Sequence, residues 1–208
     1  ADEKGASDFD VRHNLAASAS YRLPGVKQGP ARMILGDWWI DSVLFARTAM
    51  PMDVLSLSEV ESDTETGFGG AFAQVRPDYN GLPVWLDDDN APGGRRLNPD
   101  AFTKPEGFAQ GNLGRNAIRG FRAIQLDVSL RKQLQLGERA KAQVYAQAFN
   151  ILNTANFANP STQEGANLAS PIFGYATRTL NLAGGGGAGS LYRIGSPRTV
   201  QFGLRFTF

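Results

Sequence analysis

The chain has 208 residues, of which 42% are hydrophobic, 10% aromatic and 20% charged, and its formal net charge is +1. This content of apolar and aromatic residues is typical of an ordered protein, because a disordered chain lacks the side chains that build a core. Lysine and arginine are spread along the whole length, which argues against nucleic acid as a partner. The absence of cysteine excludes a disulfide scaffold and a thiolate metal site.

No run of apolar residues is long enough for a transmembrane helix, which needs about 18 or more. The chain opens on Ala1-Asp2-Glu3-Lys4-Gly5, without the apolar region of a signal peptide. A cytoplasmic protein and a segment of a longer exported chain would share both features. Membrane β-strands would also escape detection by hydropathy, because apolar and polar residues alternate along them.

In chain order, the first two predicted strands span residues 11–23 and 37–48, with a link of moderate length at 24–36. In both strands apolar and polar residues alternate with a period of two, which puts one kind on each face. The apolar residues of the first strand are Leu15, Ala17, Ala19, Tyr21 and Leu23. Those of the second strand are Trp38, Ile40, Leu44 and Ala46, with Ser42 interrupting their face.

The next stretch, roughly 49–120, is rich in Gly, Pro, Asn and Asp, and we expect its residues 52–118 to be extracellular and largely irregular. Two strands follow at 121–132 and 139–150, and a tight link at 134–138 predicts a hairpin. The residues expected to face outward are Ile124, Leu126, Val128 and Leu130, and those expected to face inward are Gln125, Asp127 and Ser129. The apolar residues of the second of these strands are Ala140, Ala142, Val144, Ala146 and Ala148.

A second long stretch, residues 151–197, precedes the last strand. We expect its residues 155–196 to be extracellular and largely irregular, with short strands around 173–180. The final strand, 200–208, has a wholly apolar face, with Arg205 on the other face. The outward residues of that strand are Val200, Phe202, Leu204 and Phe206, and Phe208 ends the chain printed here on the same side.

The lengths of these strands and links favour a membrane sheet over a soluble β-sandwich. Each predicted strand has about the 9–11 residues that a tilted strand needs to cross a bilayer. Short and long links alternate, as they do in bacterial outer-membrane barrels. A sandwich would instead show turn signals every 8–12 residues or so. We therefore predict an all-β fold: about five to six antiparallel membrane strands of a partial barrel with long extracellular loops, and no second domain within residues 1–208.

The last eight residues resemble the assembly signal of bacterial outer-membrane barrels. That signal has a polar residue, a glycine two places later, and aromatic or apolar residues at the antepenultimate and final positions. The matching residues are Gln201, Gly203, Phe206 and Phe208. The open edge of such a strand can pair with the insertion machinery before the barrel closes.

Further segments resemble the C-terminal barrel of Oar-like TonB-dependent transporters, which often carry a carboxypeptidase-regulatory-like domain. These segments are Ser7–His13, Gly36–Ile40, Leu97–Phe102, Gly111–Asn116 with Arg119-Gly120, Ala148–Asn153 and Asn156–Pro160. The resemblance implies a Gram-negative cell outer membrane, nutrient uptake of unknown substrate, and no enzymatic activity. It implies as partners the membrane lipid, the barrel-assembly machinery, the remainder of the barrel with its plug and, indirectly, TonB.

One departure from that family concerns size. Its barrels have about 22 strands around a plug, whereas this sequence supplies five or six strands and shows no plug. The chain is therefore either a fragment of a longer polypeptide or a short protein with another role.

Residues suited to catalysis or metal binding are few. His13 is the only histidine, and a hydrogen-bonded residue at the start of a strand is the simpler interpretation than a general base. Asp87–Asn90 is a dense acidic segment that suits either a solvated loop tip or a contact with an ion or a sugar, with Trp85 and Tyr79 nearby. We predict no catalytic, cofactor or metal site. The alternative function is a stand-alone secreted β-rich protein, either a carbohydrate-binding module or an Asp/Glu-dependent hydrolase.

Overall fold

The computed structural model describes residues 4–26, 28–59, 72–106, 110–138, 140–183 and 193–208. Contacts between Cα atoms divide the chain into two compact units. The sheet unit comprises residues 13–47, 123–156 and 180–208, and the loop unit comprises residues 1–12, 48–122 and 157–179. Each unit has a fold of its own.

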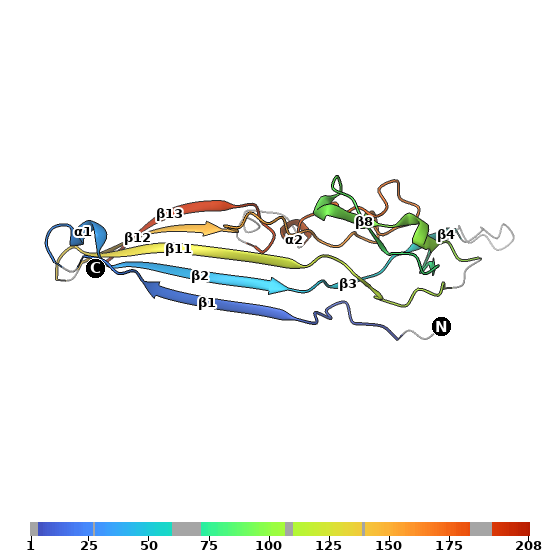
Figure 1. Cartoon of the computed structure of the whole chain (residues 1–208), viewed down its shortest axis with the longest axis horizontal. Coiled ribbons are helices and arrows are strands. Elements are labelled where there is room, and N and C mark those ends of the chain that lie inside the picture. Colours follow the sequence, from blue (N-terminus) through green and yellow to red (C-terminus); the bar gives the residue numbers. More distant parts are fainter. Residues whose placement is uncertain (1–3, 27, 60–71, 107–109, 139, 184–192) are drawn as a thin grey trace. The chain divides into compact units, whose positions relative to one another are not determined.

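The sheet unit is built on one antiparallel sheet of five strands in the order β1-β2-β11-β12-β13. The strands are β1 (Asn14–Arg22), β2 (Trp38–Arg47), β11 (Ala123–Gln135), β12 (Lys141–Phe149) and β13 (Thr199–Thr207). Figure 1 shows them side by side, from blue β1 to red β13. The prediction of an all-β fold is confirmed, and each of the five predicted strands is present within three residues of its expected ends.

The register of the sheet places the apolar residues of neighbouring strands beside one another. Leu44 of β2 lies between Ala17 of β1 and Leu126 of β11. Further along, Ala146 of β12 lies between Leu130 of β11 and Phe202 of β13. Because side chains alternate along every strand, this register gives the sheet one apolar face and one mostly polar face.

Small residues on β12 make room for large ones on the strands beside it. Ala142 lies between Leu134 and Phe206, and only 3% of its surface remains exposed. Alanine at such positions lets the large side chains of the two flanking strands cover the main chain between them. The alanine-rich sequence of this strand is therefore explained by its central place between β11 and β13.

The connections within the sheet unit are short at one end. The link between β1 and β2 contains the one-turn helix α1 (Arg32–Leu35). The hairpin predicted at 134–138 is shifted, because β11 continues to Gln135 and β12 begins at Lys141, with the Leu136 N–H donating to the Ala140 carbonyl at 2.9 Å. A second short helix, α2 (Leu180–Ala183), precedes the last strand. Within the described ranges, no helix is long and apolar enough to cross a membrane.

The ends of the ladder are completed by amide side chains. The pairing of β11 with β12 begins at Val128, so Ile124 has no partner on that strand. Its main-chain N–H donates to the side-chain oxygen of Asn156 at 2.8 Å, and its carbonyl accepts from the side-chain amide of Asn156 at 2.9 Å. The Gln125 carboxamide accepts from the Gly195 N–H at 3.0 Å. The Asn150 amide donates to the carbonyls of Thr154 and Ser196. These amides replace the missing strand partners, since a buried main-chain group without a hydrogen bond is costly.

The described part of the stretch 52–118 is more ordered than expected, whereas the described part of 155–196 is largely irregular, as predicted. The described part of the loop unit holds four two-stranded ribbons and two short 3-10 helices. The ribbons are β3 (Pro51–Met52) with β10 (Ile118–Arg119), β4 (Ser56–Glu59) with β5 (Phe72–Val75), β6 (Asp78–Tyr79) with β9 (Phe102–Thr103), and β7 (Trp85–Asp87) with β8 (Arg95–Leu97). The 3-10 helices are η1 (Pro92–Gly94) and η2 (Pro99–Ala101). The short strands expected around 173–180 are absent, and Thr179 makes only an isolated bridge with Phe157.

A small hydrophobic core holds the loop unit together. Its buried residues are Met52, Val54, Leu97, Ala101, Phe102, Leu113, Ile118 and Ala166. These residues come from segments far apart in the sequence and follow no local period. Their packing therefore depends on tertiary contacts that a pattern of two or 3.6 residues does not show.

The contact between Gly203 and Tyr145 gives a direct test of the β12–β13 packing. The two residues are paired across the strands, and a Cβ at position 203 would overlap the Tyr145 ring. We expect Gly203→Ala to lower the free energy of unfolding by about 1–3 kcal/mol, since the added methyl group forces the ring to move. The measurement is urea unfolding of the full-length protein in lipid vesicles.

The control for this prediction is Gly137→Ala, because a Cβ at Gly137 meets no atom within 4 Å. The double variant with Tyr145→Ala should remove most of the added cost of Gly203→Ala. If Gly203→Ala lowered the free energy of unfolding equally with and without the Tyr145 ring, the steric explanation would be disproved.

Candidate functional site

The apolar face of the five-stranded sheet is an exposed hydrophobic surface. On β13 alone Val200, Phe202, Leu204 and Phe206 are exposed, Phe202 by 81%. A surface of this extent is rare on a protein in water and marks contact with another apolar medium. The predicted division of β11 and β13 into an apolar and a polar face is confirmed by the register of the sheet.

A lysine that the sequence analysis missed marks one end of the apolar face. Lys132 continues the alternation of β11 after Leu130 and pairs with Trp38 of β2. Its side chain is 5% exposed, and its ammonium donates to the carbonyls of Ile34 (3.2 Å) and Gly36. The same ammonium lies 5.3 Å from the centroid of the Trp38 ring.

These contacts are of the kind expected where an apolar strand surface ends at water. A lysine can bury its aliphatic stem against apolar surface while its charged end reaches polar groups. The Trp38 indole N–H donates to the Ile34 carbonyl at 2.9 Å, and Tyr21 at the end of β1 lies on the same face. Tryptophan and tyrosine are typical of the interface between lipid and water. The signal in the sequence was the single charge within an otherwise apolar alternation.

The opposite face carries ionic and polar contacts that join the strands. Asp41 of β2 accepts from Arg131 of β11, through Nε at 2.7 Å and Nη2 at 3.3 Å, and from the hydroxyl of Ser20 on β1. The guanidinium of Arg131 also lies 5.2 Å from the centroid of the Trp39 ring. A two-pronged arginine–carboxylate contact fixes both distance and orientation. Three neighbouring strands are thereby tied together on the polar side.

A hollow of about 920 Å³ lies over the polar face. Its lining includes Asp41, Arg131, Gln143 and Gln147, which all project from the polar side of their strands. Gln201 of β13 donates to the side-chain oxygen of Gln147. Polar side chains of this kind suit a wall that borders water or other protein, as the inside of a membrane barrel does.

The four residues predicted to form the assembly signal divide between the two faces. Gln201 and Gly203 lie on the polar face, where the first bonds to Gln147 and the second leaves space for Tyr145. Phe206 lies on the apolar face opposite Ala142, and Phe208 follows the end of β13 with 94% of its surface exposed. Gln201 and Gly203 thus have packing roles of their own. Recognition by an assembly receptor stays a prediction.

The residues considered for catalysis or metal binding are not brought together. His13 is exposed just before β1. In the acidic segment Asp87–Asn90, Asp88 accepts from Arg96 at 3.1 Å and from the Asn90 N–H at 3.0 Å, which stabilises a turn. Among the residues that the structure describes, no group of three or more acidic, histidine or cysteine side chains is suited to hold a metal ion.

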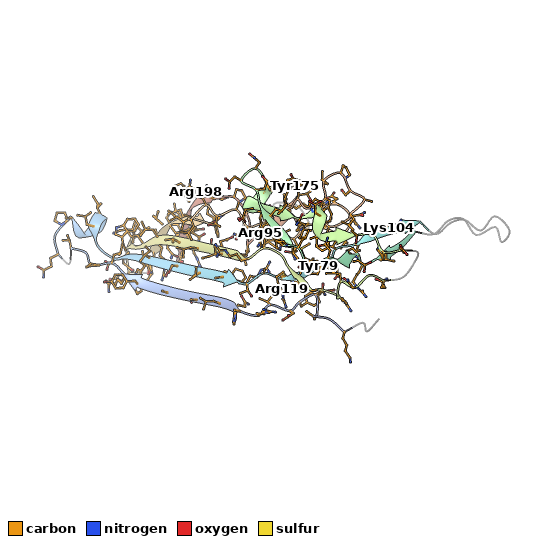
Figure 2. The ribbon with its side chains drawn as sticks, turned by 45° about the vertical axis from the view of Figure 1, so that its right-hand side comes forward. Tyr79, Arg95, Lys104, Arg119, Tyr175 and Arg198 are labelled. Carbon is orange, nitrogen blue, oxygen red and sulfur yellow. The ribbon has the colours of Figure 1, made fainter. Side chains whose placement is uncertain are left out.

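The two aromatic residues near the acidic segment anchor the loop unit. The Tyr79 hydroxyl donates to the Leu82 carbonyl at 2.8 Å, and its ring lies 6.1 Å from that of Phe102. The Trp85 indole N–H donates to the Arg119 carbonyl at 3.1 Å. Figure 2 labels Tyr79 and Arg119 among the side chains of this unit. Of the two interpretations left open for these rings, the contacts favour anchoring over sugar binding.

Comparison with known proteins gave one family. A family model described as an outer membrane beta barrel domain matches residues 1–201. Neither the curated proteins nor the solved structures gave a match. The matched range covers nearly the whole chain, including four of the five long strands and the start of the fifth.

The two faces of the sheet predict opposite effects for one substitution at adjacent positions. Val128 and Ser129 are neighbours on β11, the first on the apolar face and the second beside Asp41 on the polar face. We expect Val128→Arg to cost about 2–4 kcal/mol, since it places a charge near the middle of the bilayer. Ser129→Arg should change stability little, because its charge meets the Asp41 carboxylate.

The measurement is the amount of folded protein in the outer membrane, read from its heat-dependent migration on a gel. If Ser129→Arg lowered this amount more than Val128→Arg, the assignment of the two faces would be reversed.

Proposed function

The chain belongs to the family of outer membrane beta barrel domains, and we propose that it is part of a barrel that takes up nutrients with energy from TonB. Its fold is all-β and its location is the outer membrane, as expected from the sequence. This location is incompatible with the alternative of a stand-alone secreted protein.

The observation that supports a transport role is the two-faced sheet. One face is apolar and exposed, and the other carries the Asp41–Arg131 ion pair and a polar hollow. A polar wall of this kind lines the inside of a membrane barrel, which is the route that a solute would take. The proposal assigns no catalytic role to the chain.

The edges of the sheet support the proposal that further strands complete the barrel. Among the described residues, β1 pairs only with β2, and β13 pairs only with β12. Unpaired main-chain groups are not tolerated in hydrocarbon, so each edge requires another strand. The resemblance to TonB-dependent transporters suggests a remainder of the barrel with a plug, which TonB would move.

The alternation of links supports an orientation. The link at 136–140 is short and that at 23–37 is of moderate length, whereas 48–122 and 150–198 are much longer. In bacterial barrels short turns are periplasmic and long loops extracellular. We therefore propose that α1, Lys132 and Phe208 lie on the periplasmic side and that the residues of the loop unit are extracellular.

Dependence on TonB is tested by genetics, which does not require the substrate to be identified first. Cells that lack this protein, cells that lack TonB and cells that lack both are grown on a panel of limiting nutrients. We expect the loss of this protein to slow growth on a subset of the nutrients affected by the loss of TonB, with no further effect in the double deletion. Growth defects that add to the loss of TonB would contradict the proposal.

Assembly is tested at the chain terminus printed here. Because β13 exposes an unpaired edge until the barrel closes, a receptor must bind it during insertion, and Phe206 and Phe208 are the exposed aromatic residues at that end. We expect deletion of Phe208 to lower the amount of protein in the outer membrane and to raise its degradation in the periplasm, as followed by fractionation and immunoblot.

The control for this experiment is Thr207→Ser, which keeps a small polar residue on the polar side of β13. Wild-type amounts of the Phe208 deletion in the outer membrane would show that these residues are not an assembly signal.

A further inference from the structure

A cavity of about 700 Å³ lies within the loop unit. Its lining includes three arginines, Arg95, Arg119 and Arg122, and no acidic residue. The volume is in the range of about 300–1,000 Å³ that small-molecule sites occupy. The positive lining indicates a preference for negatively charged molecules.

Arg95 is only partly buried and is held in place by two aromatic rings and a main-chain carbonyl. The guanidinium carbon lies 4.2 Å from the centroid of the Trp85 ring and 4.9 Å from that of Phe121. The two rings meet edge to face, with centroids 5.4 Å apart. One nitrogen, Nη2, donates to the Gly120 carbonyl. Among the described residues, no carboxylate lies within ion-pair distance of Arg95.

Arg122 adds a second charge that no described carboxylate neutralises. Its side chain is exposed and makes no ion pair with the residues that the structure describes. Burial lowers the pKa of the Arg95 guanidinium, the nearby charge of Arg122 lowers it further, and Asp87 acts in the opposite direction. Repulsion between the two guanidinium groups would be relieved by an anion bound between them.

The third arginine differs from these two. Arg119 is paired with Asp10, whose carboxylate and main-chain carbonyl both accept from it. Its charge is therefore already compensated. Figure 2 labels Arg95 and Arg119, which project from β8 and β10.

The remaining lining of the cavity is largely apolar. Val84, Ile118 and the Phe121 ring contribute to its wall, with Ala49 and Ala117 beside them. Such a wall favours a ligand with an apolar body, because water leaves both surfaces on binding. The Trp85 side chain is only partly buried and also suits a flat ligand, since an aromatic face stacks on planar groups.

We propose that this cavity binds a small organic carboxylate with a flat apolar body, whose carboxylate is held by Arg95 and Arg122. Arginine matches the planar geometry of a carboxylate through two parallel N–H donors. The inference rests on the proposed uptake function, for which it names the class of substrate.

Binding is measured by calorimetry on the full-length protein in detergent micelles, with 1-naphthoate as the probe. The uncharged 1-naphthamide has nearly the same shape, and inorganic phosphate carries charge without an apolar body. We expect both to bind at least about tenfold more weakly than 1-naphthoate, since each lacks one of the two recognised parts. Equal binding of 1-naphthamide would disprove recognition of charge, and equal binding of phosphate would disprove the apolar part.

Three variants assign the effect to the cavity. Arg122→Gln removes an exposed side chain that makes no ion pair with the described residues, so the fold should persist, and we expect about tenfold weaker binding of 1-naphthoate. Arg95→Lys keeps the charge but loses the forked donor, and it should weaken binding as well. Lys104→Gln is the matched control, because Lys104 is exposed in the same unit and does not line the cavity. Unchanged affinity in Arg122→Gln would overturn the proposal.

The outcome separates this inference from the proposed function. If the protein does not bind 1-naphthoate but inserts normally into the outer membrane and supports TonB-dependent growth, only the ligand class is rejected. Specific binding of 1-naphthoate together with growth that is independent of TonB would retain the site and reject the energy source.

Discussion

The main-chain pairing between β2 and β11 is the contact on which the rest of the sheet depends. It joins two hairpins, β1–β2 and β11–β12, that are separated in the sequence by residues 48–122. Hydrocarbon offers no water to strand main chains, so the ladder must be continuous. Its register also decides the chemistry of both surfaces. A slip of one residue would place Asp41 and Arg131 in lipid and Leu44 and Leu126 inside.

Where the ladder ends, side chains take over the role of a neighbouring strand. At the end that leads into the loops, Asn156 bonds both main-chain groups of Ile124. At the other end, Lys132 donates to carbonyls of the α1 turn beside Trp38. An unpaired main-chain group away from water costs several kcal/mol, about 2–7 depending on the reference state. The amide and lysine contacts therefore allow the strands to stop without a penalty at the membrane boundary.

The loop unit has a different physical basis. Its ribbons are two to four residues long, and such short pairs are not stable alone. A core that includes Val54, Leu97 and Phe102 stabilises them together. A packed core also fixes the directions of side chains such as Arg95, whose guanidinium lies against both Trp85 and Phe121. A binding site on a preorganised loop loses less conformational entropy when a ligand binds.

The sequence by itself determined the five long strands, their two faces and the all-β class, because alternation with a period of two is a local property that residues such as Val200 and Phe202 display directly. The resemblance to outer-membrane transporters was also present in the sequence, and the family match confirms its coarser part. The tertiary structure alone decided which strands are neighbours, why Gly203 faces Tyr145, and why Lys132 is compatible with an apolar face. It also showed that the long stretches are packed and that Arg95 and Arg122 line one cavity. These features arise from contacts between residues distant in the sequence, and such contacts leave no periodic signal in any one segment.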